Sequence, residues 1–170
     1  MKMILRSVIF AVLLVPLVVF GKDSVSGAFV VKDKSTQFKY VYAYRKAQRM
    51  DPSKSDLYVL LSDIAVPSDA LPAKEEALSK IAQLVRENKI HALELRFNTG
   101  GTDKLNDAEQ GAVYHNAIAP ARNGVSGPLI YRQVSDDGKV LRGEVKMDKD
   151  MAGMLGWTAD AKFEVALPPK

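Results

Sequence analysis

The chain has 170 residues, of which 47% are hydrophobic and 26% charged, and it contains no cysteine. A chain of this length supports one ordinary hydrophobic core, and the lack of thiols excludes disulfides, thiolate metal ligands and a cysteine nucleophile. The formal net charge is +4, but acidic and basic residues are interspersed without a basic stripe, so a nucleic-acid-binding protein is not expected.

The first twenty-one residues have the pattern of a secretory signal peptide. Lys2 and Arg6 precede an apolar run at 8–20, and Gly21 is small enough for the last position before a cleavage site. The apolar run is shorter than the roughly 20 residues that a membrane-spanning helix needs. Cleavage after residue 21 is therefore predicted, and an uncleaved N-terminal anchor is the alternative.

This leader divides the sequence into a signal peptide at 1–21 and a single domain at 22–170. It predicts an exported protein, periplasmic or extracellular, without a stable membrane span after cleavage. The expected partners are accordingly a small molecule or an envelope protein.

Residues 27–33 and 37–46 are predicted to form a β-hairpin, because a turn-like segment separates two β-rich segments. The second strand alternates strictly, which places four aromatic residues on one face: Phe38, Tyr40, Tyr42 and Tyr44. Tyrosine offers rigid amphipathic contact area, so this stripe is the candidate ligand-binding surface. The alternative is that the stripe forms part of the hydrophobic core.

The segment Leu57–Asp63 is apolar on both faces, which is typical of a central strand covered on both sides. Ala73–Lys89 carries apolar residues at i, i+3 and i+4 spacing, with acidic residues in its first turn and basic residues in its last. This pattern predicts an amphipathic helix lying on a sheet.

Five further strands are predicted, at 90–98, 111–119, 128–134, 139–147 and 161–167. An Asp-Gly pair at 137–138 indicates a hairpin between the third and fourth of them. The expected fold is mainly β (α+β): an antiparallel β-sandwich or partly closed barrel of about eight strands, with one helix inserted after the third strand.

Two histidines, His91 and His115, are the residues on which a hydrolase or metal-dependent enzyme would depend. Such a site requires the two imidazoles within about 8 Å of each other or of a shared carboxylate. No G-x-S-x-G motif is present, and the histidines are not spaced as ligands on one helix. His91 is better explained as a strand-end residue that caps the core, so no catalytic residue, metal or cofactor is predicted.

Two glutamates on predicted strands, Glu94 and Glu144, raise the possibility of a glycosidase carboxylate pair. Each alternates with basic residues, Glu94 with Arg96 and Glu144 with Arg142 and Lys146. Solvated cross-strand charge pairs explain this pattern better.

Several short segments resemble a family of small, exported, uncharacterised bacterial proteins. They are 27–44, LYVLLSD at 57–63, the helix end at 87–89, HALELRF at 91–97, and Tyr114-His115 with the later Asp-Gly hairpin. The resemblance implies export and one compact domain, and because no activity is assigned to the family it supplies no catalytic residue. The favoured function is a non-enzymatic binding protein; a small hydrolase or metal-dependent enzyme using His91 and His115 and a structural envelope subunit are the alternatives.

Overall fold

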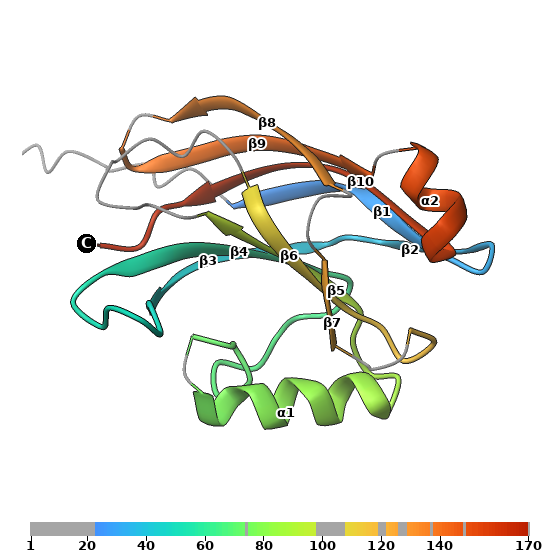
Figure 1. Cartoon of the computed structure of the whole chain (residues 1–170), viewed down its shortest axis with the longest axis horizontal. Coiled ribbons are helices and arrows are strands. Elements are labelled where there is room, and N and C mark those ends of the chain that lie inside the picture. Colours follow the sequence, from blue (N-terminus) through green and yellow to red (C-terminus); the bar gives the residue numbers. More distant parts are fainter. Residues whose placement is uncertain are drawn as a thin grey trace, which may run out of the picture.

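The computed structural model describes residues 23–73, 75–97, 108–118, 122–125, 129–136, 138–147 and 149–169. These residues form two five-stranded antiparallel sheets packed face to face, with a helix on the outer face of one sheet (Figure 1). The predicted mainly β sandwich is therefore confirmed, and the described strands do not close into a barrel. The predicted leader at 1–21 lies outside the described residues.

Sheet A contains, in spatial order, β2 (Lys34–Gln37), β1 (Ser24–Val31), β10 (Trp157–Ala166), β9 (Val140–Met147) and β8 (Leu129–Asp136). Sheet B contains β3 (Tyr40–Ala47), β4 (Ser55–Ser62), β5 (Ala92–Phe97), β6 (Ala108–Tyr114) and β7 (Arg122–Val125). Helix α1 (Glu75–Arg86) connects β4 to β5, and the short helix α2 (Lys149–Leu155) connects β9 to β10. Neither of these described helices has the length and apolar character needed to span a bilayer.

The predicted hairpin between the first two long strands is wrong. Strand β1 pairs with β2 and β10, whereas β3 pairs with β4 in the other sheet. The cause is a tight turn at Lys32 and Asp33, whose φ angles of 48° and 64° reverse the chain into β2. The short strand β2 lies in the predicted turn-like segment and β7 lies between two predicted strands, so the described residues form ten strands and α1 follows the fourth.

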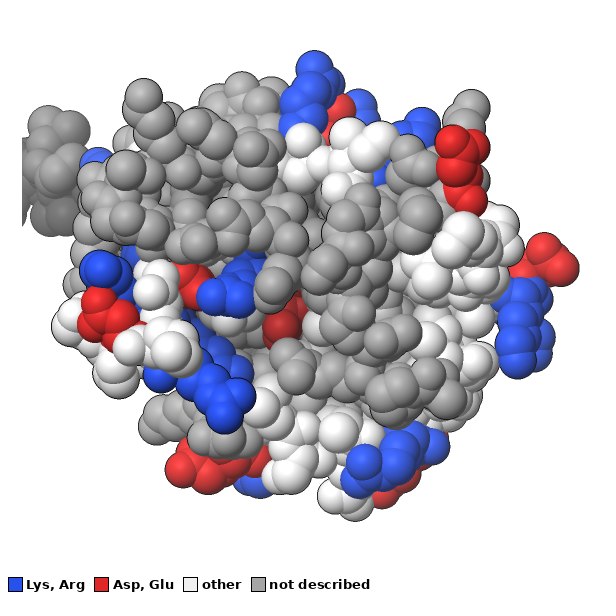
Figure 2. Space-filling view, viewed as in Figure 1, with Lys and Arg blue, Asp and Glu red and all other residues white. Residues whose placement is uncertain are grey.

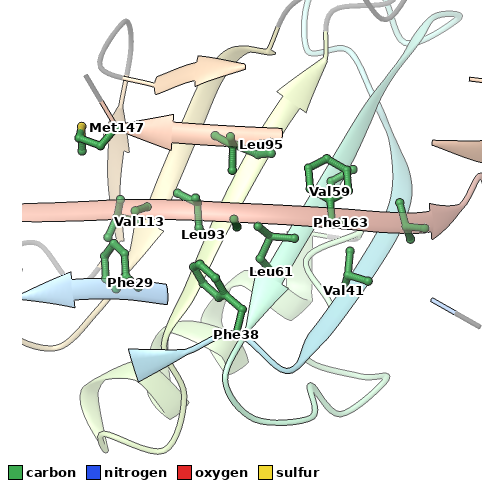
Figure 3. Close-up of a cluster of buried hydrophobic side chains, with 14 of the residues drawn as sticks. Phe29, Phe38, Val41, Val59, Leu61, Leu93, Leu95, Val113, Met147 and Phe163 are labelled. Carbon is green, nitrogen blue, oxygen red and sulfur yellow. The ribbon is translucent and has the colours of Figure 1, made fainter. Parts of the chain in front are cut away.

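The interior between the sheets is filled by apolar side chains (Figure 3). Alternate residues of β10 point inward and belong to one apolar cluster with residues of β3, β4 and β5 in the opposite sheet. Phe29, Leu61, Leu93 and Phe163 each expose 4% or less of their surface. The hairpin predicted around the Asp-Gly pair is confirmed, because β8 and β9 pair antiparallel and complete this side of the core.

Helix α1 builds a second, smaller core on the outer face of sheet B. Ala77, Ile81 and Val85 follow one another at four-residue spacing and are buried against the sheet. Leu60 of β4 contributes to this second core, while its neighbours Val59 and Leu61 contribute to the first. The prediction of a central strand covered on both sides is thus confirmed.

The outer face of sheet A carries charged residues instead of a helix. Glu144 lies 2.6 Å from Arg132 and 3.1 Å from Lys162, and Arg142 lies 2.9 Å from Glu164. The hydrogen bond from Arg132, with that from Lys162, lowers the pKa of Glu144. The predicted solvated charge pairing is confirmed for this glutamate.

Gly143 tests how tightly the interior is packed. A Cβ atom at this position would lie 2.7 Å from Phe163 Cζ and 2.8 Å from Tyr131 Cε2. Gly143→Ala should therefore lower the free energy of unfolding by about 1–3 kcal/mol, measured by urea denaturation. Gly153→Ala is the control: in α2 a Cβ there has no neighbour within 4 Å, and the change should raise stability by about 0.5–1 kcal/mol. Equal effects of the two substitutions would contradict a close-packed interior.

Candidate functional site

The aromatic stripe predicted on one face is divided between two faces. Tyr42 and Tyr44 belong to the outer face of sheet B beside α1, whereas Phe38 lies in the core between the sheets. Phe38 precedes β3, and regular alternation begins only at Tyr40, after the Lys39 N–H donates to the Ser62 carbonyl. The expectation that Phe38 shares a surface with the three tyrosines is therefore wrong.

The three tyrosines differ in what their side chains contact. Tyr40 is 41% exposed, while the Tyr42 hydroxyl accepts a hydrogen bond of 3.0 Å from the Val66 N–H. Tyr44 is buried, and its hydroxyl donates to Glu94 Oε2 at 2.7 Å. Tyr42 thus fixes the loop before α1 to sheet B, and Tyr44 belongs to the interior of the second core.

Glu94 is the main residue that sequence reasoning placed wrongly. Its residue surface is 4% exposed, and a second hydroxyl, from Tyr114, donates to the same Oε2 at 2.9 Å. Burial, with the negative charge of Glu94, raises the pKa of Tyr44 well above its ordinary value, so Tyr44 keeps the proton that it donates. Glu94 is a buried, hydrogen-bonded carboxylate and not a solvated charge pair.

Beyond Tyr44, the outer face of sheet B continues as a partly exposed polar and aromatic area. We call Lys46, Gln48, Tyr58 and Arg96 the Tyr58 surface. The Tyr58 ring stacks on the Tyr44 ring with centroids 5.5 Å apart, and Lys46 Nζ lies 6.0 Å from the Tyr58 centroid. All four residues of this surface are half-buried.

A buried aspartate, Asp56, holds two side chains of the Tyr58 surface by hydrogen bonds. Asp56 is 1% exposed, and its Oδ2 accepts hydrogen bonds from Arg96 at 2.6 and 2.8 Å. Its other oxygen accepts a 2.7 Å hydrogen bond from Gln48 Nε2. Asp56 therefore fixes the orientation of both polar side chains, and the Tyr58 surface has a preformed shape.

The two histidines lie side by side, as the enzyme alternative required. Ala92 of β5 pairs with Tyr114 of β6, so His91 and His115 are the next residues across from each other, and their ring centroids are 4.3 Å apart. His115 also contacts Phe29, at a centroid distance of 5.6 Å. The predicted location of His91 at a strand end beside the core is confirmed, and β5–β6 pairing brings the two rings together.

Asp63 and the end of α1 complete this group, which we call the histidine cluster: Asp63, Asn88, His91 and His115. Asp63 accepts 2.8 Å hydrogen bonds from the His91 backbone and ring Nδ1. The helix ends in a Schellman turn, in which Asn88 has a φ of 55° and the Lys89 N–H donates to the Leu84 carbonyl. That turn places Asn88 Oδ1 3.0 Å from His91 Nε2.

The pKa values in the cluster are shifted by burial and by these hydrogen bonds. Burial lowers the pKa of His115 to about 4, and the adjacent His91 contributes in the same direction. Burial alone would raise the pKa of Asp63, but the hydrogen bonds from His91 outweigh it and hold that pKa below its ordinary value. At neutral pH His115 is uncharged, and its Nδ1 accepts the Ala117 N–H at 3.0 Å.

In this geometry, His91 connects the residue after β4 to the end of α1 through hydrogen bonds. Both ring nitrogens of His91 are hydrogen-bonded, one to β4's end and one to the end of α1, so neither is available as a general base. In the described part of the chain, no serine hydroxyl is bonded to either ring, and no three His, Cys, Asp or Glu side chains are placed to hold a metal ion.

Tyr44→Phe measures how far the second core depends on Glu94. Removing one hydroxyl leaves the buried carboxylate with one donor fewer, so the free energy of unfolding should fall by about 1.5–3 kcal/mol. Tyr40→Phe is the matched control, because Tyr40 is 41% exposed, and it should change stability by less than about 0.5 kcal/mol in the same urea titration. Similar losses in both variants would argue against a special role of the Glu94 contact.

His115 should make stability depend on pH in a defined range. The unfolded histidine takes up a proton near its ordinary pKa of 6.5, whereas the folded one does so only near 4. The free energy of unfolding should therefore fall by up to about 3 kcal/mol as the pH decreases from about 6.5 to about 4. Asp63 contributes only at lower pH, since its folded pKa lies below 3.8.

His115→Asn is the variant for this measurement, because the amide oxygen can still accept the Ala117 N–H and does not titrate. Urea unfolding at a series of pH values should show a shallower slope for this variant between pH 6.5 and 4. An unchanged slope would show that other groups cause the acid sensitivity.

Comparison with known proteins gives no match: no family model, curated protein or solved structure is significantly similar to this chain.

Proposed function

We propose that this chain is an exported, non-enzymatic binding protein that recognises a partner protein through the Tyr58 surface. The observation that carries the proposal is the stacked, partly exposed Tyr58 ring beside Lys46 and Arg96 on a preformed support. Export follows from the predicted leader at 1–21.

Because the interior is filled by side chains, we look for the binding site on the surface of the protein. The core between the sheets is filled by side chains that are nearly all inaccessible. The buried hydroxyls of Tyr44 and Tyr114 both donate to Glu94. On the outer face of sheet B, Tyr40 is 41% exposed and Tyr58 is half-buried, and of these two it is Tyr58 that stacks on a neighbouring ring.

The composition of the Tyr58 surface is that of an interface hot spot. Tyrosine and arginine are enriched at such positions, because both provide contact area with few rotamers to immobilise. Asp56 already orients Arg96 and Gln48, which reduces the entropy lost on binding. The outer face of sheet A is less suited, because its charged side chains pair with one another.

A depression of about 320 Å³ on sheet A illustrates this difference. Its lining includes Arg142, Glu144, Lys162 and Glu164, which form ion pairs of 2.9 and 3.1 Å among themselves. A ligand entering it would have to replace these contacts, so we do not assign it a binding role.

The enzyme alternative is less well supported because His91 has no free ring nitrogen. An exposed, unpaired edge strand would favour the third possibility, a structural assembly subunit. Among the described edge strands, β2 and β7 have four residues each, and β8 has a register shift between Gln133 and Ser135. Of the edges that the structure describes, β3 alone is long and regular, and one such edge does not provide the two that repeated edge-to-edge assembly uses.

Site-specific photo-crosslinking in the native envelope tests the proposal. A photoreactive amino acid in place of Tyr58 should give a discrete adduct with a protein, whereas the same amino acid in place of Thr158, exposed on sheet A, should not. The adduct's protein, once purified, should bind the native chain, and Tyr58→Ala should weaken that binding at least tenfold, or by about 1.4 kcal/mol.

Two controls separate binding from folding. Tyr58→Ala must unfold cooperatively in urea, and Thr158→Ala should leave affinity unchanged. Adducts of equal yield at both positions, or an affinity that does not respond to Tyr58→Ala, would contradict the proposal.

A further inference from the structure

The edge of sheet B next to the Tyr58 surface indicates the chemistry of the partner. Resting on the proposed function, we infer that the partner presents an acidic, extended segment that adds as a strand to the free edge of β3. The inference depends on the free edge of β3, on cations without acidic partners along it, and on contact with Tyr58.

Strand β3 is eight residues long and, among the described strands, pairs on one side only, with β4. Its register with β4 is regular from Tyr40 to Ala47, so its outward backbone N–H and C=O groups form an unbroken row. Such a row can bind an extended peptide through main-chain hydrogen bonds. The other described edges are too short or too irregular for this.

Three cations at the end of this edge have no acidic partner among the residues that the structure describes. Within the described residues, no carboxylate forms an ion pair with Arg45, Lys46 or Arg49. Other arginines of the sheets are paired, Arg96 with Asp56 and Arg142 with Glu164. Figure 2 shows several Lys and Arg side chains at the end of the molecule where Figure 1 places the β3–β4 hairpin.

Arg45 provides the strongest single observation. Its Nε is buried and has no hydrogen-bond partner in the structure, which is an unfavourable arrangement for a guanidinium group. A carboxylate can accept two parallel hydrogen bonds from arginine, so an acidic group on an added strand would satisfy this nitrogen once the Arg45 side chain turns outward to the edge. Arg45 and Lys46 alternate along β3, so an added strand would meet one cation on each of its faces.

The same edge is continuous with the Tyr58 surface. Lys46 lies 6.0 Å from the Tyr58 ring centroid, between that ring and the free edge, so a long side chain of a strand added to β3 would reach the ring across Lys46. Met50, in the loop after β3, is 94% exposed and offers an apolar contact at the end of the strand. Main-chain pairing combined with an aromatic and an apolar contact favours a protein segment over a nucleic acid or a polysaccharide.

Peptide binding to the full mature chain tests the inference. The probe is a short fluorescent peptide with pairs of glutamates between valines, measured by anisotropy at about 0.1 M salt. We expect saturable binding, weakened at least tenfold by the triple change Arg45→Gln, Lys46→Gln and Arg49→Gln. The control triple, Arg132→Gln, Lys146→Gln and Lys162→Gln, removes the same charge from sheet A and should leave binding unchanged.

A second peptide separates strand addition from attraction between charges. It has the same sequence but methylated alternate backbone amides, so it keeps its charge and cannot extend a sheet. Equal binding of the methylated peptide, or of polyglutamate or DNA, would overturn the inference in favour of general polyanion binding. The variant that lacks Arg45, Lys46 and Arg49 could instead aggregate and still bind the peptide normally. That result would show that these cations only prevent β3 from pairing with other chains, and it would also overturn the inference.

The proposed function can survive this failure. If the protein identified through Tyr58 binds the first triple variant as tightly as the native chain, the inference is wrong and the Tyr58 surface remains a binding site. If the peptide binds as expected but no adduct forms at Tyr58, the proposed function is wrong at that surface while the β3 edge remains a binding site.

Discussion

Burial of both faces of sheet B is the constraint on which the rest of the structure depends. One face packs against sheet A, and the other lies under α1 and the loop before it. Sheet A has only one buried face, and its outer face is solvated and charged. A polar residue buried in sheet B must therefore find a partner within the fold, whereas the charged residues on the outer face of sheet A pair in contact with water.

This constraint explains why the three acidic residues of the β4–β5 region are so well hydrogen-bonded. Glu94 receives two tyrosine hydroxyls, Asp56 an arginine and an amide, and Asp63 a histidine ring and a backbone N–H. Unpaired, each would be costly to bury. Each pairing also connects residues from different elements, so the satisfied carboxylates specify how the strands and α1 fit together. Arg45 differs from these three carboxylates, because its buried Nε has no hydrogen-bond partner in the structure.

Much of this fold could be predicted from hydrophobic periodicity. The alternation of β10, the doubly apolar β4 and the stripe of α1 each indicated the correct element. The pairing of β1 could not be predicted, because the positive φ angles at Lys32 and Asp33 occur without glycine and leave no clear signal. Glu94 was misplaced for a related reason: alternation shows which face of a strand a residue occupies, but not that helix α1, which ends eight residues earlier in the chain, packs on that face.

 Helix α1 precedes β5 in the chain, and its position over Glu94 follows from tertiary packing and not from local sequence.

The pairing of β1 with β10 has a consequence for how the chain reaches this structure. Ser24 lies opposite Glu164, so the centre of sheet A is made from the first and the last described strands. Contacts between such distant segments form slowly, because the loop between them must close before any pairing energy is gained. During synthesis, sheet A cannot assemble until the final strand has been made. Strand β1 therefore waits for its central partner until nearly the whole domain has been made, so the core between the two sheets is completed late.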